Sequence, residues 1–85
     1  MDKVDTVLRA IMADVLGLGE DRAAALTDES ELFGALPEFD SMSVAVVLTE
    51  LEDRLGIIID DEDVDGELFA TFGNLLRFCR AKLAA

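Results

Sequence analysis

Apolar residues recur every three or four positions in three separate stretches of the chain, and this spacing limits the folds available to it. The stretches span about residues 3–16, 41–55 and 71–83. A period near 3.6 residues places such side chains on one face of an α-helix. Three amphipathic helices are therefore predicted, with buried faces formed by Val4, Val7, Leu8, Ile11, Met12 and Val15, by Val44, Val47, Leu48, Leu51 and Leu55, and by Phe72, Leu75, Leu76, Cys79 and Leu83.

Capping residues mark the ends of these helices. Gly17 and Gly19 interrupt the first pattern. Asp40 can accept amides of the second helix as its N-cap, and Gly56 suits its C-terminal end. Thr71 is a candidate N-cap for the last helix.

The segments between the helices carry weaker signals. Residues 17–40 have no clear periodicity, and Leu26, Leu32 and Phe33 are expected to anchor them to the core. Ile57–Ile59 has no second strand pattern to pair with, so we expect a buried loop. One short helix is predicted over Val64–Phe69. The expected fold is all-α: a small four-helix bundle with three longer helices and one short one.

The length and the net charge of the chain limit the classes of function that are open to it. The 85 residues suit one domain spanning residues 1–85. A formal charge of −12 disfavours nucleic acid, because phosphate binding needs clustered Lys and Arg. A basic protein partner is one explanation of this charge, and simple solubility is the other.

Cys79 is the only cysteine, and no signal peptide or membrane-spanning run is evident. We expect a cytoplasmic monomer without membrane insertion.

Ser41 is the most informative single residue. The chain contains no histidine that could activate it, and its surroundings do not form a Gly-x-Ser-x-Gly elbow, so a catalytic nucleophile is disfavoured. Asp40 and Ser41 could simply cap the helix. Alternatively, Ser41 is an attachment point for a group added by another enzyme. The positive end of the helix dipole would stabilise a phosphodiester there.

A second candidate site is the acidic run after residue 60. Asp61, Asp63 and Asp65 match the first half of a calcium-binding EF-hand loop. The match then fails, because the ninth and twelfth positions are Phe69 and Phe72. An acidic surface loop without a metal site is the preferred interpretation, and a calcium-binding module stays open as the alternative.

The wider context of Ser41 resembles the acyl carrier proteins. Leu32–Pro37 precedes Asp40-Ser41-Met42, and the helix that follows ends at Leu55-Gly56-Ile57. The resemblance implies that Ser41 carries 4′-phosphopantetheine, transferred from coenzyme A by a phosphopantetheinyl transferase. A discrete carrier of this kind holds acyl or aminoacyl groups as thioesters and catalyses nothing itself. Its implied partners are acyl-loading, condensing or acyl-transfer enzymes with basic surfaces.

One position departs from the family pattern. The family often has glycine two residues before the Asp of the Asp-Ser pair, and this chain has Glu38. The run from Pro37 to Met42 looks closest to discrete carriers associated with exosortase and exopolysaccharide systems.

The exposed side of the second helix is the expected partner surface. It comprises Met42, Val46, Thr49, Glu50 and Asp53, which lie opposite or beside the apolar face. Its carboxylates would meet basic residues, and Met42 and Val46 would add apolar contact. Val46 is equally explained as a lone surface valine. An acidic adaptor without a prosthetic group is the remaining alternative function.

Overall fold

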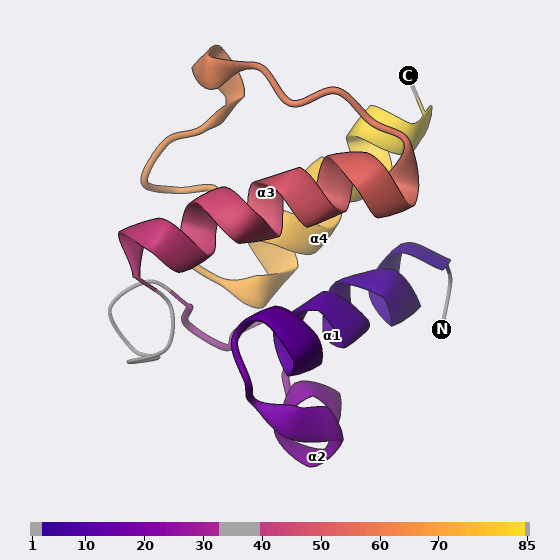
Figure 1. The fold of residues 1–85 in the computed structure, drawn as a ribbon. Helices are drawn as coiled ribbons and strands as arrows, with labels where there is room; N and C mark the ends of the chain where they lie inside the picture. The colour runs from indigo at the N-terminus through magenta and orange to yellow at the C-terminus, as the bar shows by residue number, and fades with distance from the viewer. Residues whose placement is uncertain (1–2, 33–39, 85) are drawn as a thin grey trace.

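The computed structural model describes residues 3–32 and 40–84, with the side chain of Ser41 left out. Its elements in chain order are α1 (Lys3–Val15), α2 (Gly19–Ala24), α3 (Ser41–Leu55), the 3-10 helix η1 (Asp61–Asp63) and α4 (Phe72–Ala84) (Figure 1). Among the described residues there is no strand, and one isolated bridge pairs Glu31 with Thr71. The predicted all-α class, with three longer helices and one short helix, is confirmed.

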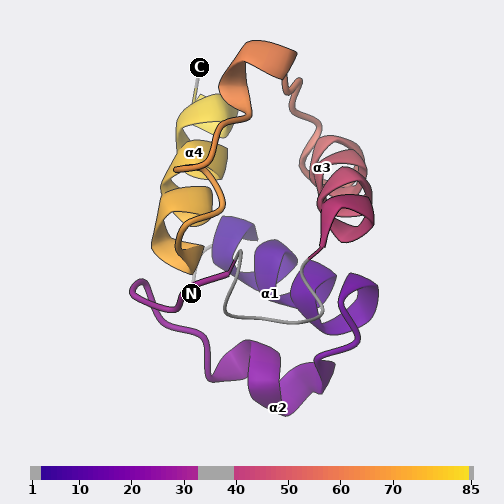
Figure 2. The ribbon, with the colours of Figure 1, turned by 90° about the vertical axis from the view of Figure 1, so that its left-hand side faces the viewer.

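Helix α1 is the centre of the arrangement. Figure 2 shows α3 and α4 on opposite sides of α1, with α2 below it and the α3–α4 connection crossing over the top. Helix α1 packs against all three of the other helices. The face that it buries includes Val4, Leu8, Ile11 and Met12, four of the six predicted positions. The periodicity of the sequence therefore located this helix correctly.

Helix α3 has the predicted bounds because both of its ends are capped. The Asp40 carboxylate accepts a hydrogen bond from the Ser43 amide at 2.8 Å, which satisfies a donor that has no partner within the helix. At the other end, Gly56 adopts a left-handed conformation with φ of 67°, and its amide donates to the Glu52 carbonyl. Glycine reaches this conformation without steric cost, so the helix stops there.

The loop that precedes α3 supplies part of the cap of α4. The carbonyls of Ser30 and Asp28 accept the amides of Phe72 at 2.8 Å and Gly73 at 3.0 Å. The loop approaches so closely that a Cβ atom on Gly73 would lie 2.7 Å from the Asp28 carbonyl oxygen. The hydroxyl of Thr71, the predicted N-cap, also accepts an amide of the first turn at 3.1 Å.

The core lies between α1, α3 and α4. Side chains from all three helices and from the loop before α3 are fully buried, namely Leu8, Ile11, Met12, Leu32, Val47, Leu51, Phe72, Leu75 and Cys79. Each of these residues was expected to be buried from its spacing or its apolar character. Phe33, which was expected to join them, lies outside the described residues.

The predicted position of the short helix is wrong. The chain forms turns rather than a helix over Val64–Phe69, and η1 lies just before that range. Asp65 Oδ1 accepts the amides of Glu67 and Leu68, both at 3.0 Å. A short acidic side chain that binds nearby amides in this way competes with helix formation. The short helix is instead α2, inside the segment that was predicted to lack regular structure.

Arg9 of α1 explains why so short a helix as α2 persists. Its guanidinium donates to three carbonyls at the end of α2 and in the following turn: Ala23 at 2.7 Å, Ala24 at 3.1 Å and Leu26 at 2.8 Å. Nε of the same group contacts the Asp5 carboxylate at 2.6 Å, and the guanidinium carbon lies 4.8 Å from the centre of the Phe72 ring. One side chain thus links α1, α2 and α4.

Two other expectations about burial are wrong. Within the predicted buried loop Ile57–Ile59, only Ile57 is buried, whereas Ile58 is 75% exposed. Leu83, predicted on the buried face of the last helix, is 42% exposed because it lies in the final turn of α4. Apolar periodicity continues to the end of a helix even where no neighbouring element covers that end.

None of the helices in the described part of the chain is long and apolar enough to cross a membrane.

Candidate functional site

The first turn of α3 contains the candidate attachment residue. Asp40 precedes the helix in an extended conformation, and Ser41 is its first residue. Asp40 is exposed, and Met42 on the other side of Ser41 is 80% exposed. The Ser41 side chain itself lies outside the described part of the structure. Ser41 therefore occupies a backbone position between two residues that solvent and partners can reach.

The electrostatics of this turn favour an anionic group. The Ser43 amide, followed by the Ser43 side chain, hydrogen-bonds the Asp40 carboxylate and holds its pKa below the ordinary value. The lowered pKa reflects the hydrogen-bond donors that are free at the start of the helix. A phosphodiester attached at Ser41 would lie in the same favourable field. The first turn of α3 carries no acidic residue, and the carboxylate directly before it belongs to the N-cap Asp40.

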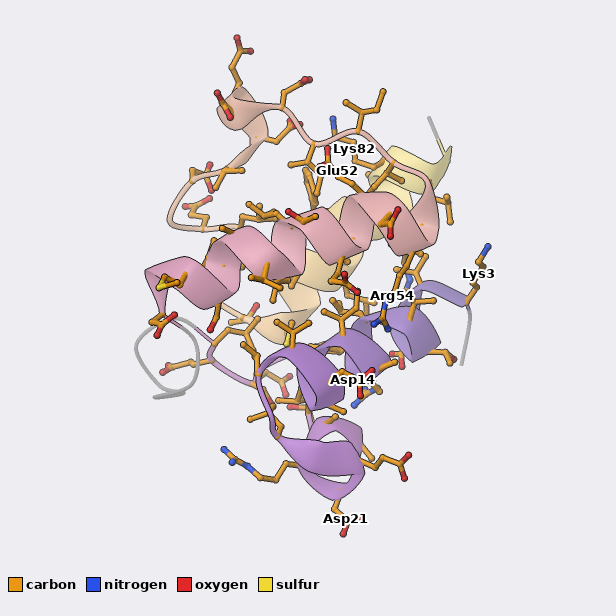
Figure 3. The ribbon with its side chains drawn as sticks, viewed as in Figure 1. Lys3, Asp14, Asp21, Glu52, Arg54 and Lys82 are labelled. Atoms are coloured by element: carbon orange, nitrogen blue, oxygen red, sulfur yellow. The ribbon has the colours of Figure 1, made fainter. Side chains whose placement is uncertain are left out.

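The residues predicted to recognise partners share the outward side of α3. Met42 is 80% and Val46 is 48% exposed, and Thr49 and Asp53 are exposed as well. Glu50 differs, since it is half-buried and pairs with Arg54 at 2.8 Å. Arg54 also reaches Asp14 of α1 at 3.7 Å, and the two side chains approach each other in Figure 3. The role of this surface in recognition stays a prediction.

Sequence reasoning missed Ala45 as part of this outward side. Ala45 is exposed, and its carbonyl accepts a hydrogen bond from the Thr49 hydroxyl at 3.0 Å. The signal was present in the spacing, because Met42, Ala45, Val46 and Thr49 recur at intervals of three and four residues, as do the residues of the buried face.

The acidic segment after α3 does not assemble a metal site in the described residues. Asp63 pairs with Lys82 of α4 at 2.7 Å and also accepts the Asp60 amide at 3.0 Å. Asp65 caps the turn that follows it. No group of three or more acidic, cysteine or histidine side chains in this part of the chain is placed to hold a metal ion. Asp63 and Asp65 are therefore engaged by groups of the protein itself, and the choice between an acidic surface segment and a calcium loop stays a prediction.

Cys79 is unsuited to thiol chemistry. Its side chain is fully buried in α4, and burial raises its pKa to about 12. The reactive form of cysteine is the thiolate, so this side chain stays inert near neutral pH. Since Cys79 is the only cysteine in the sequence, any reactive thiol must come from a group added to the protein.

Comparisons with known proteins identify the family. A family model described as "Phosphopantetheine attachment site" matches residues 6–79, which include Ser41. A search of curated proteins found no match. Among solved structures, the chain is similar to a holo acyl carrier protein from Nitrosomonas europaea, determined by solution NMR. The two are 40% identical over the whole length of both chains, with a TM-score of 0.88.

Proteins of this family interact with phosphopantetheinyl transferase and with acyl-handling enzymes. The chain belongs to the phosphopantetheine-binding acyl carrier proteins: it is a carrier rather than an enzyme, and it holds acyl groups on a covalently attached 4′-phosphopantetheine.

Proposed function

We propose that Ser41 is the residue to which 4′-phosphopantetheine is attached. The observation that carries this proposal is its position at the start of α3, directly after the capping residue Asp40 and within the matched residues 6–79. The other two serines of the chain, Ser30 and Ser43, support it because their side chains are already engaged in hydrogen bonds. The Ser30 hydroxyl accepts the Thr27 amide at 2.8 Å, and the Ser43 side chain hydrogen-bonds the Asp40 carboxylate.

The proposed modification requires little chemistry from this chain. The Ser41 hydroxyl forms a phosphodiester with the 4′-phosphopantetheine of coenzyme A, and the pyrophosphate bond breaks to release adenosine 3′,5′-bisphosphate. The serine proton passes to a base of the transferase, which is consistent with the absence of histidine in this sequence. The start of α3 contributes a favourable field for the phosphodiester. The thiol of the bound group then carries acyl or aminoacyl cargo as a thioester.

Intact-mass measurement tests the assignment. The protein is incubated with coenzyme A and a broad-specificity phosphopantetheinyl transferase, alongside Ser41→Ala and the matched control Ser43→Ala. Wild type and Ser43→Ala should each gain the mass of one phosphopantetheine, whereas Ser41→Ala should gain none. Modification of Ser41→Ala would overturn the proposal.

Partner recognition through α3 is the second part of the proposal. Reversing Glu50 and Asp53 together to Lys should slow modification most at low salt, because exposed charges are screened over about 8 Å at physiological ionic strength. Each charge should change the rate by about fivefold or less. Equal rates for wild type and the double variant at low salt would remove these two carboxylates from the recognition surface.

Other expectations from the sequence remain predictions. The cytoplasmic location and the monomeric state are consistent with a carrier that receives its arm from coenzyme A. The resemblance to exosortase-associated and exopolysaccharide-associated carriers depends on the run from Pro37 to Met42, of which residues 37–39 lie outside the described part of the structure.

A further inference from the structure

Helix α4 is basic, although the protein as a whole is strongly acidic. The sequence has 19 acidic and seven basic residues. Three of these seven, Arg77, Arg80 and Lys82, belong to α4, which contains no acidic residue. A fourth, Lys3, is the first residue of α1. Positive charge is therefore concentrated on a small part of the chain.

A groove of about 310 Å³ lies between the start of α1 and the end of α4. It is lined by Lys3, Val4, Arg80, Leu83 and Ala84. Val4 is buried, whereas Leu83 is 42% exposed. Lys3 and Arg80 are exposed as well, and the described residues that line the groove include no carboxylate. The groove thus combines apolar surface with two cations.

Local interactions within the helices explain only one of these two cations. Arg80 lies in the later turns of α4, where the negative end of the helix dipole favours a positive charge. Lys3 lies in the first turn of α1, where the positive end of the dipole disfavours one. Two like charges at one groove also repel each other. An anion bound between Lys3 and Arg80 would offset both unfavourable interactions.

The groove lies away from the candidate attachment residue. Figure 1 shows both ends of the chain on the side of the molecule opposite to the start of α3. Figure 3 shows Lys3 on that same side. A ligand in the groove therefore leaves the first turn of α3 accessible.

We propose that this groove binds a single-chain fatty carboxylate, with its alkyl chain on Leu83 and Ala84 and its carboxylate between Lys3 and Arg80. The site is separate from the carrier function and does not depend on the assignment of Ser41. Charge complementarity selects the anionic head group, and the apolar lining selects the chain.

The size of the groove and the charge of the protein disfavour larger partners. Five residues line the groove, whereas a specific protein interface uses about 20–30 residues on each side. A bilayer of anionic lipids would repel a protein with a formal charge of −12. Inorganic phosphate would leave the apolar lining without a contact. A small anion with an alkyl chain satisfies both parts of the groove.

Titration of the isotope-labelled protein with octanoate, followed by NMR, tests the proposal. The amide signals that shift should be those at the start of α1 and the end of α4. Octylammonium is the critical comparison, because the net charge of the protein attracts a cation. Octanoate should nevertheless have a Kd about fivefold lower or better, since the two cations of the groove favour only the anion.

The chain length tests the apolar part of the site. Complete burial of one CH₂ group lowers Kd by about fourfold. In an open groove we expect about half of that free energy, so Kd should fall about twofold for each CH₂ group added between hexanoate and decanoate. A Kd that does not change with chain length would overturn the proposal.

Matched variants locate the site. Lys3→Gln and Arg80→Gln should each weaken octanoate binding by about threefold or more. Arg77→Gln removes the same charge from an exposed position of α4 outside the groove, and it should change Kd by less than about 1.5-fold. Leu83→Ser should weaken binding by about threefold or more, whereas the control Ile58→Ser, at a residue that is 75% exposed, should not.

Several outcomes would contradict a fatty carboxylate site at this groove. Octylammonium that binds as tightly as octanoate would overturn it, as would losses in the control variants equal to those in the groove variants. Shifts centred on the core between α1, α3 and α4, or no saturable shift at all, would also overturn it. Circular dichroism of each variant checks that the fold is retained.

Discussion

Replacing Arg9 with methionine should destabilise the fold far more than replacing any surface arginine. Arg9 and its partner Asp5 have side chains that are only 17% and 12% exposed. The substitution keeps an unbranched apolar stem of comparable size but removes every donor. It therefore leaves the carbonyls of Ala23 and Leu26, now bound at 2.7 and 2.8 Å, without the charged group that satisfies them.

The size of this effect follows from the burial. A hydrogen bond to a charged group contributes about 1.5–3 kcal/mol, and removing one partner of a buried ion pair costs about 3–5 kcal/mol. These contributions overlap, so we expect a loss of about 3 kcal/mol in the free energy of unfolding. An 85-residue domain has a total of only about 4–13 kcal/mol. The melting temperature should fall by about 12–24 °C.

Arg54→Met is the matched control for this experiment. Arg54 also pairs with two carboxylates, Glu50 at 2.8 Å and Asp14 at 3.7 Å, but its side chain is 35% exposed. Pairs of this kind contribute about 0–1 kcal/mol. Urea-induced unfolding followed by circular dichroism measures both variants. The reasoning is refuted if Arg9→Met loses less than about 1 kcal/mol or no more than Arg54→Met.

Three further predictions concern the core and two polar contacts. Leu51→Ala should cost about 2–5 kcal/mol in urea unfolding because Leu51 is fully buried, and a loss under about 1 kcal/mol would contradict the core assignment. The Ser43 amide lowers the pKa of Asp40, so the stabilising contribution of this carboxylate is present above about pH 3.8 and is lost as pH falls through the folded pKa. The difference in melting temperature between wild type and Asp40→Ala should therefore shrink below that pH. A difference that stays constant would refute the role of Asp40 as a cap. Asp63 raises the pKa of Lys82, and Lys82 lowers the pKa of Asp63, so the contribution of the pair is complete between about pH 3.8 and 10.5. It is lost as pH rises through the folded pKa of Lys82, so Lys82→Met should approach wild type in melting temperature at alkaline pH, and a gap that widens there would count against the ion pair.

The long helices could be predicted from the sequence because their signals are local. The buried faces of α1, α3 and α4 follow from apolar spacing, and Asp40 and Gly56 mark the ends of α3 within a few residues of the chain. Helix α2 could not be predicted in the same way. It has only six residues, and its C-terminal carbonyls are satisfied by Arg9, which lies 14 residues before Ala23. Such a contact exists only after the chain has folded.

In the candidate site, too, the features that depend on local sequence could be predicted, and those that depend on side-chain placement could not. The Asp40-Ser41 pair and its place at a helix start were readable from the motif and the capping pattern. The exposure of Met42 and Val46 followed from their position opposite the buried face. The apolar character of the surface near Thr49 was not readable, since it depends on a hydroxyl that donates to its own helix. The ion pair between Glu50 and Arg54 likewise depends on side-chain placement rather than on spacing.

Counting reactive thiols tests the central claim most directly, because the carrier function requires an accessible thiol, and the one thiol of the unmodified chain, Cys79, is buried. Native protein at pH 8 should show no thiol that reacts with iodoacetamide, since burial raises the pKa of Cys79 to about 12. After incubation with coenzyme A and transferase, and removal of the free coenzyme A, it should show one. Ser41→Ala treated in the same way should stay at zero, and each protein should reveal one further thiol on denaturation. A reactive thiol gained by Ser41→Ala, or none gained by the wild-type protein, would contradict the account.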